Sequence, residues 1–430
     1  MQPPPLVPPR PAKSPSVIEL SPGGISPPRS GWLDALRAVA ALAVVLDHSS
    51  YAFLPEFRQE VMPQFTIGRY GVFLFFLVSG YIVPASLERR GCVRSFWIGR
   101  VFRMYPLWTV AVTAVLALDL LGVAEFRAGL SRQSPGTVAV AHVTLLQELL
   151  GTPGLLLVLW TLSYEMAFYL LVVALFTVRR HRRPAAVACT LAVLAAVSAA
   201  AGVALPVSAL SRAVGTGPLV ALVAVALALA VCGASAGTPV LRVAGGVLGG
   251  VSALVLVAFN GTVAMWEGLV ILAVMFLGTA IHRAERGGGG RLRPVGTAVL
   301  VLACAVGSAY RHGDGAHFTR RGWILAFLAA VVTFGVARAA RHRRVPRALT
   351  ALGAVSYSVY LVHPVLLEVT DGTVGRWRHD VPALEAAFLV ALLPLSALTH
   401  RFVELPGQAW GRRLARRVQP GSRAGGQPMW

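Results

Sequence analysis

Three ionisable side chains lie within long apolar segments of the sequence, where such groups are uncommon. His48 and His363 each lie about 15 residues into an apolar segment, and Glu165 is followed by 13 residues free of charge. An ionisable residue inside a membrane span costs several kcal/mol unless it faces the protein interior or water, so each of these residues is a functional candidate. Imidazole is the one side chain whose unperturbed pKa lies near working pH, and it therefore suits a general base.

The first apolar segment carries a cation as well as a histidine. Arg37 and His48 are eleven residues apart, so on a helix they share one face to within about 20° and differ in height by about 16 Å. Asp34 lies one turn before Arg37 and is placed to hold its guanidinium group. Asp47 points about 100° away from His48 and need not touch the imidazole. The alternative is that Arg37 extends to the membrane surface and His48 is a satisfied residue at the membrane boundary.

A pair of arginines follows the second apolar segment. Arg100 and Arg103 share a helix face at a spacing of i, i+3, and Pro106 lies in the opening turn of the next segment. Two guanidinium groups on one face suit a phosphate clamp, because each offers a planar fork of N–H donors. The alternative is that both arginines act only as orientation signals for the membrane segments.

The segments that carry these residues belong to a strongly apolar chain. Of its 430 residues, 56% are hydrophobic and 13% are charged, whereas a soluble chain carries about a quarter charged residues. The mean hydropathy is +0.68, which excludes an ordinary water-soluble enzyme. A bilayer core of about 30 Å needs roughly 20 apolar residues in a helix. Segments of this kind occur near residues 33–51, 68–87, 103–123, 155–178, 185–205, 214–235, 238–258, 262–281, 295–310, 322–340, 348–368 and 383–402.

These segments predict an all-α, polytopic membrane helix bundle of about 10–12 transmembrane helices. The run 295–310 is short, and the gaps 236–237 and 259–261 are tight enough for a re-entrant arrangement. The stretch 137–150 is amphipathic and is expected at the membrane interface.

Basic residues set the expected orientation. The net charge of +21 comes almost entirely from arginine, because Lys13 is the only lysine among the 39 basic residues. With twelve spans and a cytoplasmic N-terminus, 28 of these residues fall on the cytoplasmic side, ten fall outside, and Arg37 lies in the first span. This bias predicts cytoplasmic N- and C-termini in a multi-pass protein of the plasma membrane. Because the basic residues lie between apolar segments rather than on a soluble domain, no nucleic-acid partner is expected.

The remaining parts of the chain are short and polar. Residues 1–30 are rich in proline and serine and are predicted to form a disordered cytoplasmic tail without a cleavable signal peptide. Residues 31–406 are the expected membrane domain, and residues 407–430 are an expected basic cytoplasmic tail. The four cysteines have no metal-ligand spacing, so we expect neither a metal site nor a disulfide framework.

The order of six short motifs resembles the membrane-integral acyltransferase 3 family. The family pattern includes an Arg-x10-His first span, a Phe-Phe-x-x-Ser-Gly second span and an Arg-x-x-Arg loop. The corresponding motifs of this chain are Arg37 to His48, Phe75 to Gly80, Arg100 to Arg103, Trp160 to Tyr169, Ser356 to His363, and Glu404 to Pro406. Together they cover about residues 31–406. The family core has ten spans, two fewer than the segments counted here.

The resemblance implies a membrane-bound O-acyltransferase with no permanently bound cofactor and with cytoplasmic acyl-CoA as co-substrate. His48 would be the general base, with Glu165 orienting it or binding acceptor hydroxyls, and three arginines would bind the phosphates of coenzyme A: Arg37, Arg100 and Arg103. Other polar residues of the motifs are expected to contact substrate: Ser79, Tyr164, Tyr357 and His363. The acyl group is expected to be acetyl or another short chain. The expected acceptor is a hydroxyl of a carbohydrate, a glycolipid or a macrolide-like secondary metabolite, in a bacterium with a GC-rich genome.

Two other classes of protein remain alternatives. A proton-coupled transporter of a small polar solute also uses His, Glu and Arg inside the membrane. Such a carrier is expected to have two halves related by a repeat, and the second half of this chain has no counterpart of the Arg37–His48 segment. A purely structural membrane protein would have no need of a buried histidine and glutamate.

Overall fold

The computed structural model describes residues 31–124, 130–203, 205–286, 292–314 and 319–419. Over these residues the chain is all-α and contains no β-strand, which confirms the predicted fold class. The expected disordered tail, residues 1–30, lies outside the described residues, and so do residues 420–430 of the expected basic tail.

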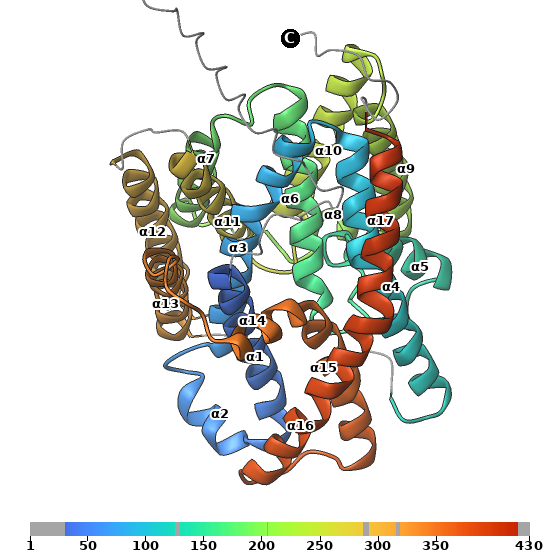
Figure 1. The fold of residues 1–430 in the computed structure, drawn as a ribbon, viewed down its shortest axis with the longest axis vertical. Coiled ribbons are helices and arrows are strands. Elements are labelled where there is room, and N and C mark those ends of the chain that lie inside the picture. Colours follow the sequence, from blue (N-terminus) through green and yellow to red (C-terminus); the bar gives the residue numbers. More distant parts are fainter. Residues whose placement is uncertain (1–30, 125–129, 204, 287–291, 315–318, 420–430) are drawn as a thin grey trace, which may run out of the picture. The chain divides into compact units, whose positions relative to one another are not determined.

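The described residues form a series of α-helices with one short 3-10 helix and one π-helical turn (Figure 1). The first half comprises α1 (Gly31–Phe53), α2 (Pro55–Val61), α3 (Ile67–Arg90), α4 (Val93–Leu120), α5 (Pro135–Val143), the 3-10 helix η1 (Gln147–Leu150), α6 (Leu159–Thr177), α7 (Pro184–Ala200), α8 (Ala209–Val214) and α9 (Thr216–Ala234). The second half comprises α10 (Pro239–Phe259), α11 (Met265–Arg286), α12 (Leu292–His312), α13 (Arg320–Ala339), α14 (Arg347–Ala354), α15 (Ser356–Thr373), α16 (Pro382–Thr399), the π-turn η2 (His400–Glu404) and α17 (Leu405–Arg417).

Ten of these helical runs are long and apolar enough to cross a membrane. The pair α14 and α15 passes the same test together but is bent by 65° at Val355, and α7 is apolar but only 17 residues long. The ten helical runs, the bent pair and α7 together correspond to the twelve apolar segments found in the sequence. The described residues therefore form a multi-pass membrane protein with ten spans, or eleven if the bent pair is one span, which lies within the predicted range.

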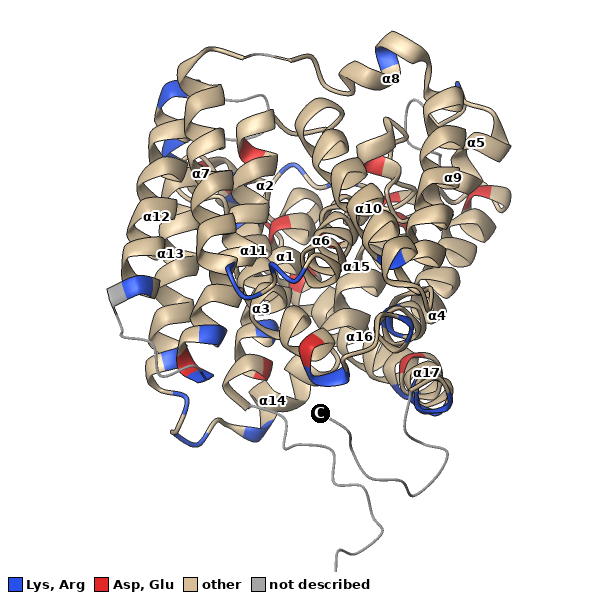
Figure 2. Ribbon diagram, turned by 90° about the horizontal axis from the view of Figure 1, so that it is seen from above, with Lys and Arg blue, Asp and Glu red and all other residues tan. Residues whose placement is uncertain are grey.

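Burial separates three central helices from the helices around them. In α3, α6 and α11, between 72% and 83% of the most apolar window is buried, whereas in α4, α9 and α12 only 28% is buried. The central helix α11 packs against α3 and α7, and α6 packs against α10. In Figure 2 most of each helix is tan, and charged segments are sparse among the helices. Exposed Leu and Val side chains of the outer helices are suited to lipid, whose hydrocarbon core they match.

The contact between α3 and α11 depends on a glycine in one of the sequence motifs. A Cβ atom at Gly80 would collide with the carbonyl group of Met275 on α11, so the two backbones can approach only because Gly80 has no side chain. The Thr279 hydroxyl donates to the Gly80 carbonyl at 2.8 Å across the same contact. The small residue at this crossing is the packing device that is typical of membrane helices.

The last membrane helix does not end where the sequence suggested. Helix α16 continues through the π-turn η2 into α17, which packs against α4 and runs to Arg417. The expected boundary between membrane domain and tail at residue 406 therefore lies inside a continuous helical run. Pro406 directly follows the π-turn, in which the Leu405 N–H donates to the His400 carbonyl.

Candidate active site

A cavity of about 120 Å³ lies among five helices: α1, α3, α4, α6 and α15. A water molecule needs about 10–15 Å³ of such volume, so the cavity has room for several waters or for the end of a slender ligand. Its polar lining comes from Arg37, Ser79, Arg100, Arg103, Thr161, Glu165, Tyr169, Ser356, Tyr357 and Tyr360. The rest of the lining is apolar, as is usual for a small-molecule site with a few placed polar groups.

Three arginines supply the positive charge of the cavity. Arg37 lies 3.9 Å from Asp34, an ion pair that confirms the contact predicted from their spacing. The Arg100 guanidinium lies 5.4 Å from the ring centre of Tyr169, and a nitrogen of that group lies 3.4 Å from the Ser86 hydroxyl. Stacking on an aromatic ring leaves the N–H edges of an arginine directed sideways, where an anion can reach them.

Glu165 is bound to neighbours that line the cavity with it. One of its carboxylate oxygens accepts hydrogen bonds from the Ser79 hydroxyl at 3.0 Å and from the Tyr169 hydroxyl at 2.5 Å. These contacts connect α6 to α3 and to the aromatic ring on which Arg100 lies. Among the described residues, the hydrogen-bond partners of Glu165 are therefore Ser79 and Tyr169 rather than His48, which the sequence offered as a residue that Glu165 would orient.

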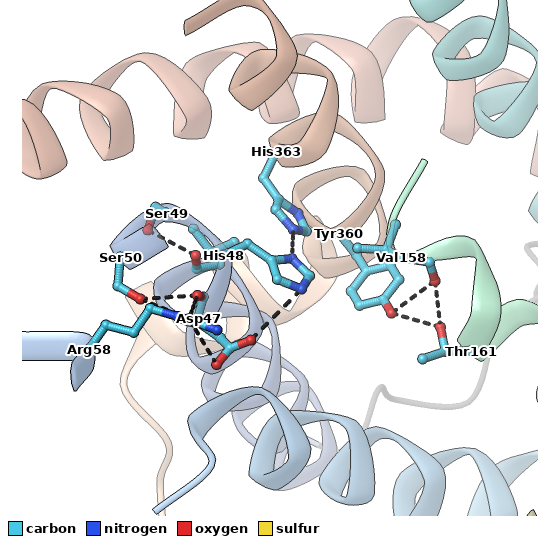
Figure 3. Close-up of polar contacts among 10 residues, drawn as sticks. Asp47, His48, Ser49, Ser50, Arg58, Val158, Thr161, Tyr360 and His363 are labelled. Carbon is cyan, nitrogen blue, oxygen red and sulfur yellow. Dashed lines mark hydrogen bonds and ion pairs between the residues drawn. The ribbon is translucent and has the colours of Figure 1, made fainter. Parts of the chain in front are cut away.

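Two hydroxyl groups lie where the cavity meets the histidines. The Thr161 and Tyr360 hydroxyl oxygens are 2.7 Å apart, and both lie within hydrogen-bond distance of the Val158 carbonyl (Figure 3). The Tyr360 ring also lies 6.0 Å from the His363 ring and 5.5 Å from the Phe75 ring, centre to centre. Tyr360 thus faces the cavity on one side and a histidine on the other.

His48 and His363 are in direct contact, although 315 residues separate them in the sequence. Nδ1 of His48 lies 2.9 Å from Nε2 of His363, and the two rings meet edge to edge with centres 5.2 Å apart and planes inclined by 21° (Figure 3). The His363 side chain is fully buried, whereas that of His48 is 17% exposed. Only His48 of the pair is open to an incoming molecule.

An acidic residue that sequence analysis set aside lies beside this pair. Oδ2 of Asp47 is 3.9 Å from Nε2 of His48, and Oδ1 is 3.6 Å from the Arg58 guanidinium. Arg58 also donates to the Asp47 carbonyl, which fixes the end of α1. Gly68 gives the Asp47 side chain its space, because a Cβ there would lie 2.5 Å from a carboxylate oxygen. Spacing along α1 alone did not reveal this arrangement, since Arg58 and Gly68 lie on other helices.

The structure gathers most, but not all, of the residues predicted for the site. Six of them line the cavity: Arg37, Ser79, Arg100, Arg103, Glu165 and Tyr357. His48 and His363 form their own pair behind Tyr360. Tyr164 does not line the cavity: its side chain is fully buried beside Gly261 and Gly268, and its hydroxyl has no hydrogen-bond partner among the described residues. Its expected substrate contact is not seen in this arrangement.

The last sequence motif, Glu404 to Pro406, lies outside the cavity and connects the helices around it. Glu404, in the π-turn η2, accepts hydrogen bonds from the Ser358 hydroxyl at 3.0 Å and from Nδ1 of His400 at 2.8 Å. Ser358 lies on α15 between Tyr357 and Tyr360, so this contact ties the site-bearing helix to the end of α16. A π-turn is a local expansion that often occurs at functional sites, and the sequence offered only the motif Glu404 to Pro406 as its signal.

The polar side chains in and beside the cavity are suited to ligand binding and proton transfer. No group of three or more His, Cys, Asp or Glu side chains in the described part of the chain is arranged to hold a metal ion. The polar groups at hand are a histidine pair, hydroxyls, a carboxylate and guanidinium groups. This set can bind a phosphate-bearing molecule, accept a proton and donate hydrogen bonds to a developing oxyanion.

Comparisons with other proteins match this chemistry. A family model described as an acyltransferase domain matches residues 30–401 of the chain. Acyltransferase MdmB of Streptomyces mycarofaciens is 32% identical over 148 residues, which are 32% of this chain and 37% of that protein. The match thus spans little more than a third of that relative's length. No solved structure matches the chain.

Proposed function

Because this chain belongs to the membrane-integral acyltransferase 3 family, whose domain model covers residues 30–401, we propose that it moves a short acyl group from acyl-CoA to a hydroxyl group. The acceptor is a carbohydrate-containing molecule or a macrolide-like secondary metabolite. One observation carries the proposal: Tyr360 lines the arginine-lined cavity, and its ring also lies 6.0 Å from the ring of His363, the partner of His48.

The three arginines fit the donor. Coenzyme A carries several phosphates, and guanidinium groups bind phosphate through paired N–H donors. Arg37, Arg100 and Arg103 lie in the first halves of α1 and α4, so they are near the ends of these helices that are expected to face the cytoplasm. The cavity of about 120 Å³ is too small for a nucleotide and suits the narrow thioester arm. In this arrangement the phosphates stay at the mouth and the thioester reaches toward Tyr360.

The reaction needs no covalent enzyme intermediate. His48 takes the proton of the acceptor hydroxyl as its oxygen attacks the thioester carbon. The oxyanion that forms on the carbonyl oxygen accepts a hydrogen bond from the Tyr360 hydroxyl, whose proton turns to it from the Val158 carbonyl or the Thr161 oxygen. Collapse of the tetrahedral intermediate breaks the carbon–sulfur bond, and the thiolate of coenzyme A takes the proton back from His48. The products are an ester and free coenzyme A.

Glu165 has a supporting role in this scheme. Its carboxylate joins Ser79 to Tyr169, and Tyr169 in turn lies against the Arg100 guanidinium. The carboxylate therefore keeps a polar part of a lining that also includes the apolar Phe75 and Phe76 side chains. Its free lone pairs are available to an acceptor hydroxyl, which the acceptor-binding role requires.

A transfer assay tests the proposal. Membranes that contain the protein are given radiolabelled acetyl-CoA, and label is scored in the glycan, lipid and small-molecule fractions. We expect label in one fraction with wild type and none above background with His48→Ala at equal expression. If no fraction is labelled with wild type over a range of short acyl-CoA donors, the proposal is wrong.

The direction of transfer depends on the orientation of the chain. A reporter fused beyond Arg423 should report a cytoplasmic C-terminus, because 28 of the 39 basic residues then lie on the cytoplasmic side. A reporter signal from the opposite side would place the arginine end of the cavity away from cytoplasmic acyl-CoA and would overturn the assignment of the donor. The transporter alternative, by contrast, predicts uptake of a solute with no labelled product.

A further inference from the structure

Arg90, the last residue of α3, is held against the first turns of α4. One of its guanidinium nitrogens, Nη1, donates to the carbonyl oxygen of Ser95 at 2.6 Å. The guanidinium group lies on Gly99, because a Cβ atom at this position would be 2.4 Å from the same nitrogen. Only glycine leaves this space open, so the sequence of α4 itself fixes where the Arg90 side chain lies.

Arg90 continues the row of arginines that begins in the cavity. Arg100 and Arg103 line the cavity, whereas Arg90 does not. A nitrogen of Arg100 lies 3.4 Å from the Ser86 hydroxyl. Arg90 follows Ser86 by four residues, which is one turn of α3 or about 6 Å farther along the helix. The positive charge of Arg100 is close enough to act on that of Arg90. Three guanidinium groups therefore follow one another from the cavity to the end of α3.

This row of positive charges has no acidic partner within the described ranges at Arg90 or Arg100. The carboxylate nearest to Arg90 in the sequence, that of Glu88, pairs with Arg283 at 2.7 Å. Nε of Arg100 is buried and has no hydrogen-bond partner in that part of the chain. Neighbouring guanidinium groups repel each other unless an anion lies between them. The arrangement is therefore suited to a bound anion.

The order of the groups in coenzyme A matches this row. Its thioester arm leads to a pyrophosphate, and the ribose beyond the pyrophosphate carries a 3′-phosphate. From this match we infer that Arg90 binds the 3′-phosphate of the donor, whereas Arg100 and Arg103 bind its pyrophosphate. A phosphate monoester has close to two negative charges at pH 7 and forms paired hydrogen bonds with a guanidinium group. The inference rests on the proposed function, and it makes Arg90 the residue that distinguishes coenzyme A from donors without a 3′-phosphate.

Competition for bound coenzyme A tests the inference without an acceptor. Purified protein in phosphatidylcholine micelles is given radiolabelled coenzyme A, and adenosine 3′,5′-bisphosphate is compared with adenosine 5′-monophosphate as the competitor. With wild type we expect the bisphosphate to compete about ten- to a hundredfold better, as one charge-assisted contact would give. In Arg90→Gln the two competitors should differ by less than about twofold, because the group that binds the 3′-phosphate is gone.

Two further variants show whether the position of the guanidinium group matters. Gly99→Ala keeps the charge of Arg90 but places a Cβ atom against it, and alanine favours a helix more than glycine does, so α4 should persist. This variant should lose the preference for the bisphosphate as Arg90→Gln does. Arg242→Gln is the matched control, because the exposed Arg242 is also held by a backbone carbonyl, that of Gly237 at 2.9 Å, and does not line the cavity. It should keep the wild-type preference.

Transfer kinetics check the same discrimination with intact donors. In Arg90→Gln the KM for acetyl-CoA should rise about ten- to a hundredfold at unchanged kcat, because the 3′-phosphate lies far from the reacting atoms and contributes equally to binding the ground state and the transition state. The KM for acetyl-3′-dephospho-CoA should change by less than about twofold, since this donor lacks the group that Arg90 binds. A fall in kcat with both donors would mean that Arg90 only supports the fold, and the inference would be wrong.

The outcomes separate this inference from the proposed function. If wild type binds coenzyme A and Arg90→Gln prefers the bisphosphate as strongly as wild type does, the inference is wrong and the proposed function stands. Phosphatidic acid titrated into the micelles should not compete with the bisphosphate. Competition by this lipid in wild type but not in Arg90→Gln would assign Arg90 to a lipid phosphate and overturn the inference. If wild type neither binds coenzyme A nor transfers label, the proposed function is wrong and the inference is wrong with it.

Discussion

Charged side chains lie within the helices in two regions of the molecule, and the two regions differ in the space around the charge. Arg37, Arg100 and Arg103 line a cavity of about 120 Å³. Arg69, at the start of α3, instead lies 2.9 Å from the Glu267 carboxylate, which also accepts from the indole N–H of Trp323 at 2.9 Å. The side chains of Arg69 and Glu267 are 15% and 2% exposed, and neither lines the cavity.

The difference shows that charge within a membrane span is not enough to mark an active site. In the second region the ion pair neutralises itself, and the Trp160 ring lies over the Arg69 guanidinium at 5.0 Å. In the first region the charge faces space that a ligand can fill. A charged side chain paired inside the protein, such as Arg69 with Glu267 in this closed region, holds helices together. Charged side chains that face a cavity, as in this open region, can bind a ligand. The two regions are expected to respond differently to substitution.

The largest effect is expected at His48, the exposed member of the histidine pair next to the open region. His48→Ala should leave insertion and expression normal and lower turnover by about two to four orders of magnitude, the usual range for a positioned base. Higher acyl-CoA should not restore the rate, because the loss lies in the chemical step. Turnover is measured by label transfer at saturating donor, with His342→Ala as the control. If His48→Ala keeps near-normal turnover, His48 is not the general base of the reaction.

The closed region is expected to affect stability instead. Glu267→Leu leaves the Arg69 charge buried without its partner, which should lower the free energy of unfolding by about 3–5 kcal/mol. The double variant Arg69→Met with Glu267→Leu should regain much of this loss, because two apolar side chains remove the unpaired charge. Unfolding is measured by denaturant titration in mixed micelles. If Glu267→Leu instead lowers turnover at wild-type stability, the closed region takes part in the reaction and the contrast fails.

Sequence alone located the elements well and their contacts poorly. The twelve apolar segments correspond to the membrane helices. Inside the bilayer a span must form all its backbone hydrogen bonds as a helix, so its length appears in the sequence as an apolar run. The 65° bend at Val355 was not foreseen, since the residues on both sides of it are equally apolar. The contact between His48 and His363 spans 315 residues, and no local period reveals it.

Adjacent residues of a motif also separate in ways that sequence does not decide. Tyr164 and Glu165 are neighbours on α6, yet Glu165 lines the cavity and Tyr164 packs away from it. The cause is the rotation of about 100° per residue, which turns neighbours to different faces. Similarly, Arg69 lies in the segment 68–87 and Glu267 in the segment 262–281, and the sequence indicates no pairing between them. The contacts of Glu267 with Arg69 and Trp323 form only when α3, α11 and α13 are brought together.

A smaller effect on binding is expected at the mouth of the open region. Arg100→Ala and Arg103→Ala should each remove a charge-assisted contact worth about 1.5–3 kcal/mol, or roughly ten- to a hundredfold in donor affinity. Both arginines line the cavity, so higher acyl-CoA should partly rescue the rate. Initial rates over a range of donor concentrations check this. If activity is unchanged at limiting donor, these arginines only orient the chain in the membrane, and the open region does not bind the phosphates of acyl-CoA.

The smallest effect is expected at an ion pair on the exposed surface. Comparing it with the pair Arg69–Glu267 shows how much of the effect on stability depends on burial. Glu56 lies 2.8 Å from Nδ1 of His379, with side chains 53% and 84% exposed. Hydrogen bonds from His379 and from the Asp380 N–H lower the pKa of Glu56 below its ordinary value. A lowered pKa means that the pair contributes stability above the ordinary glutamate pKa and loses it as the pH falls through the lowered value.

Water and salt screen such a pair, so its contribution should be slight. We expect Glu56→Gln to shift the unfolding midpoint at pH 7 far less than Glu267→Leu does, and the difference from wild type should shrink as the pH falls through the lowered pKa of Glu56. Midpoints measured in the same micelles at pH 7 and pH 3.5 check both statements. A midpoint shift at pH 7 as large as that of Glu267→Leu would show that exposure does not separate the two pairs. The closed region would then owe its expected stability effect to something other than the burial of its charge.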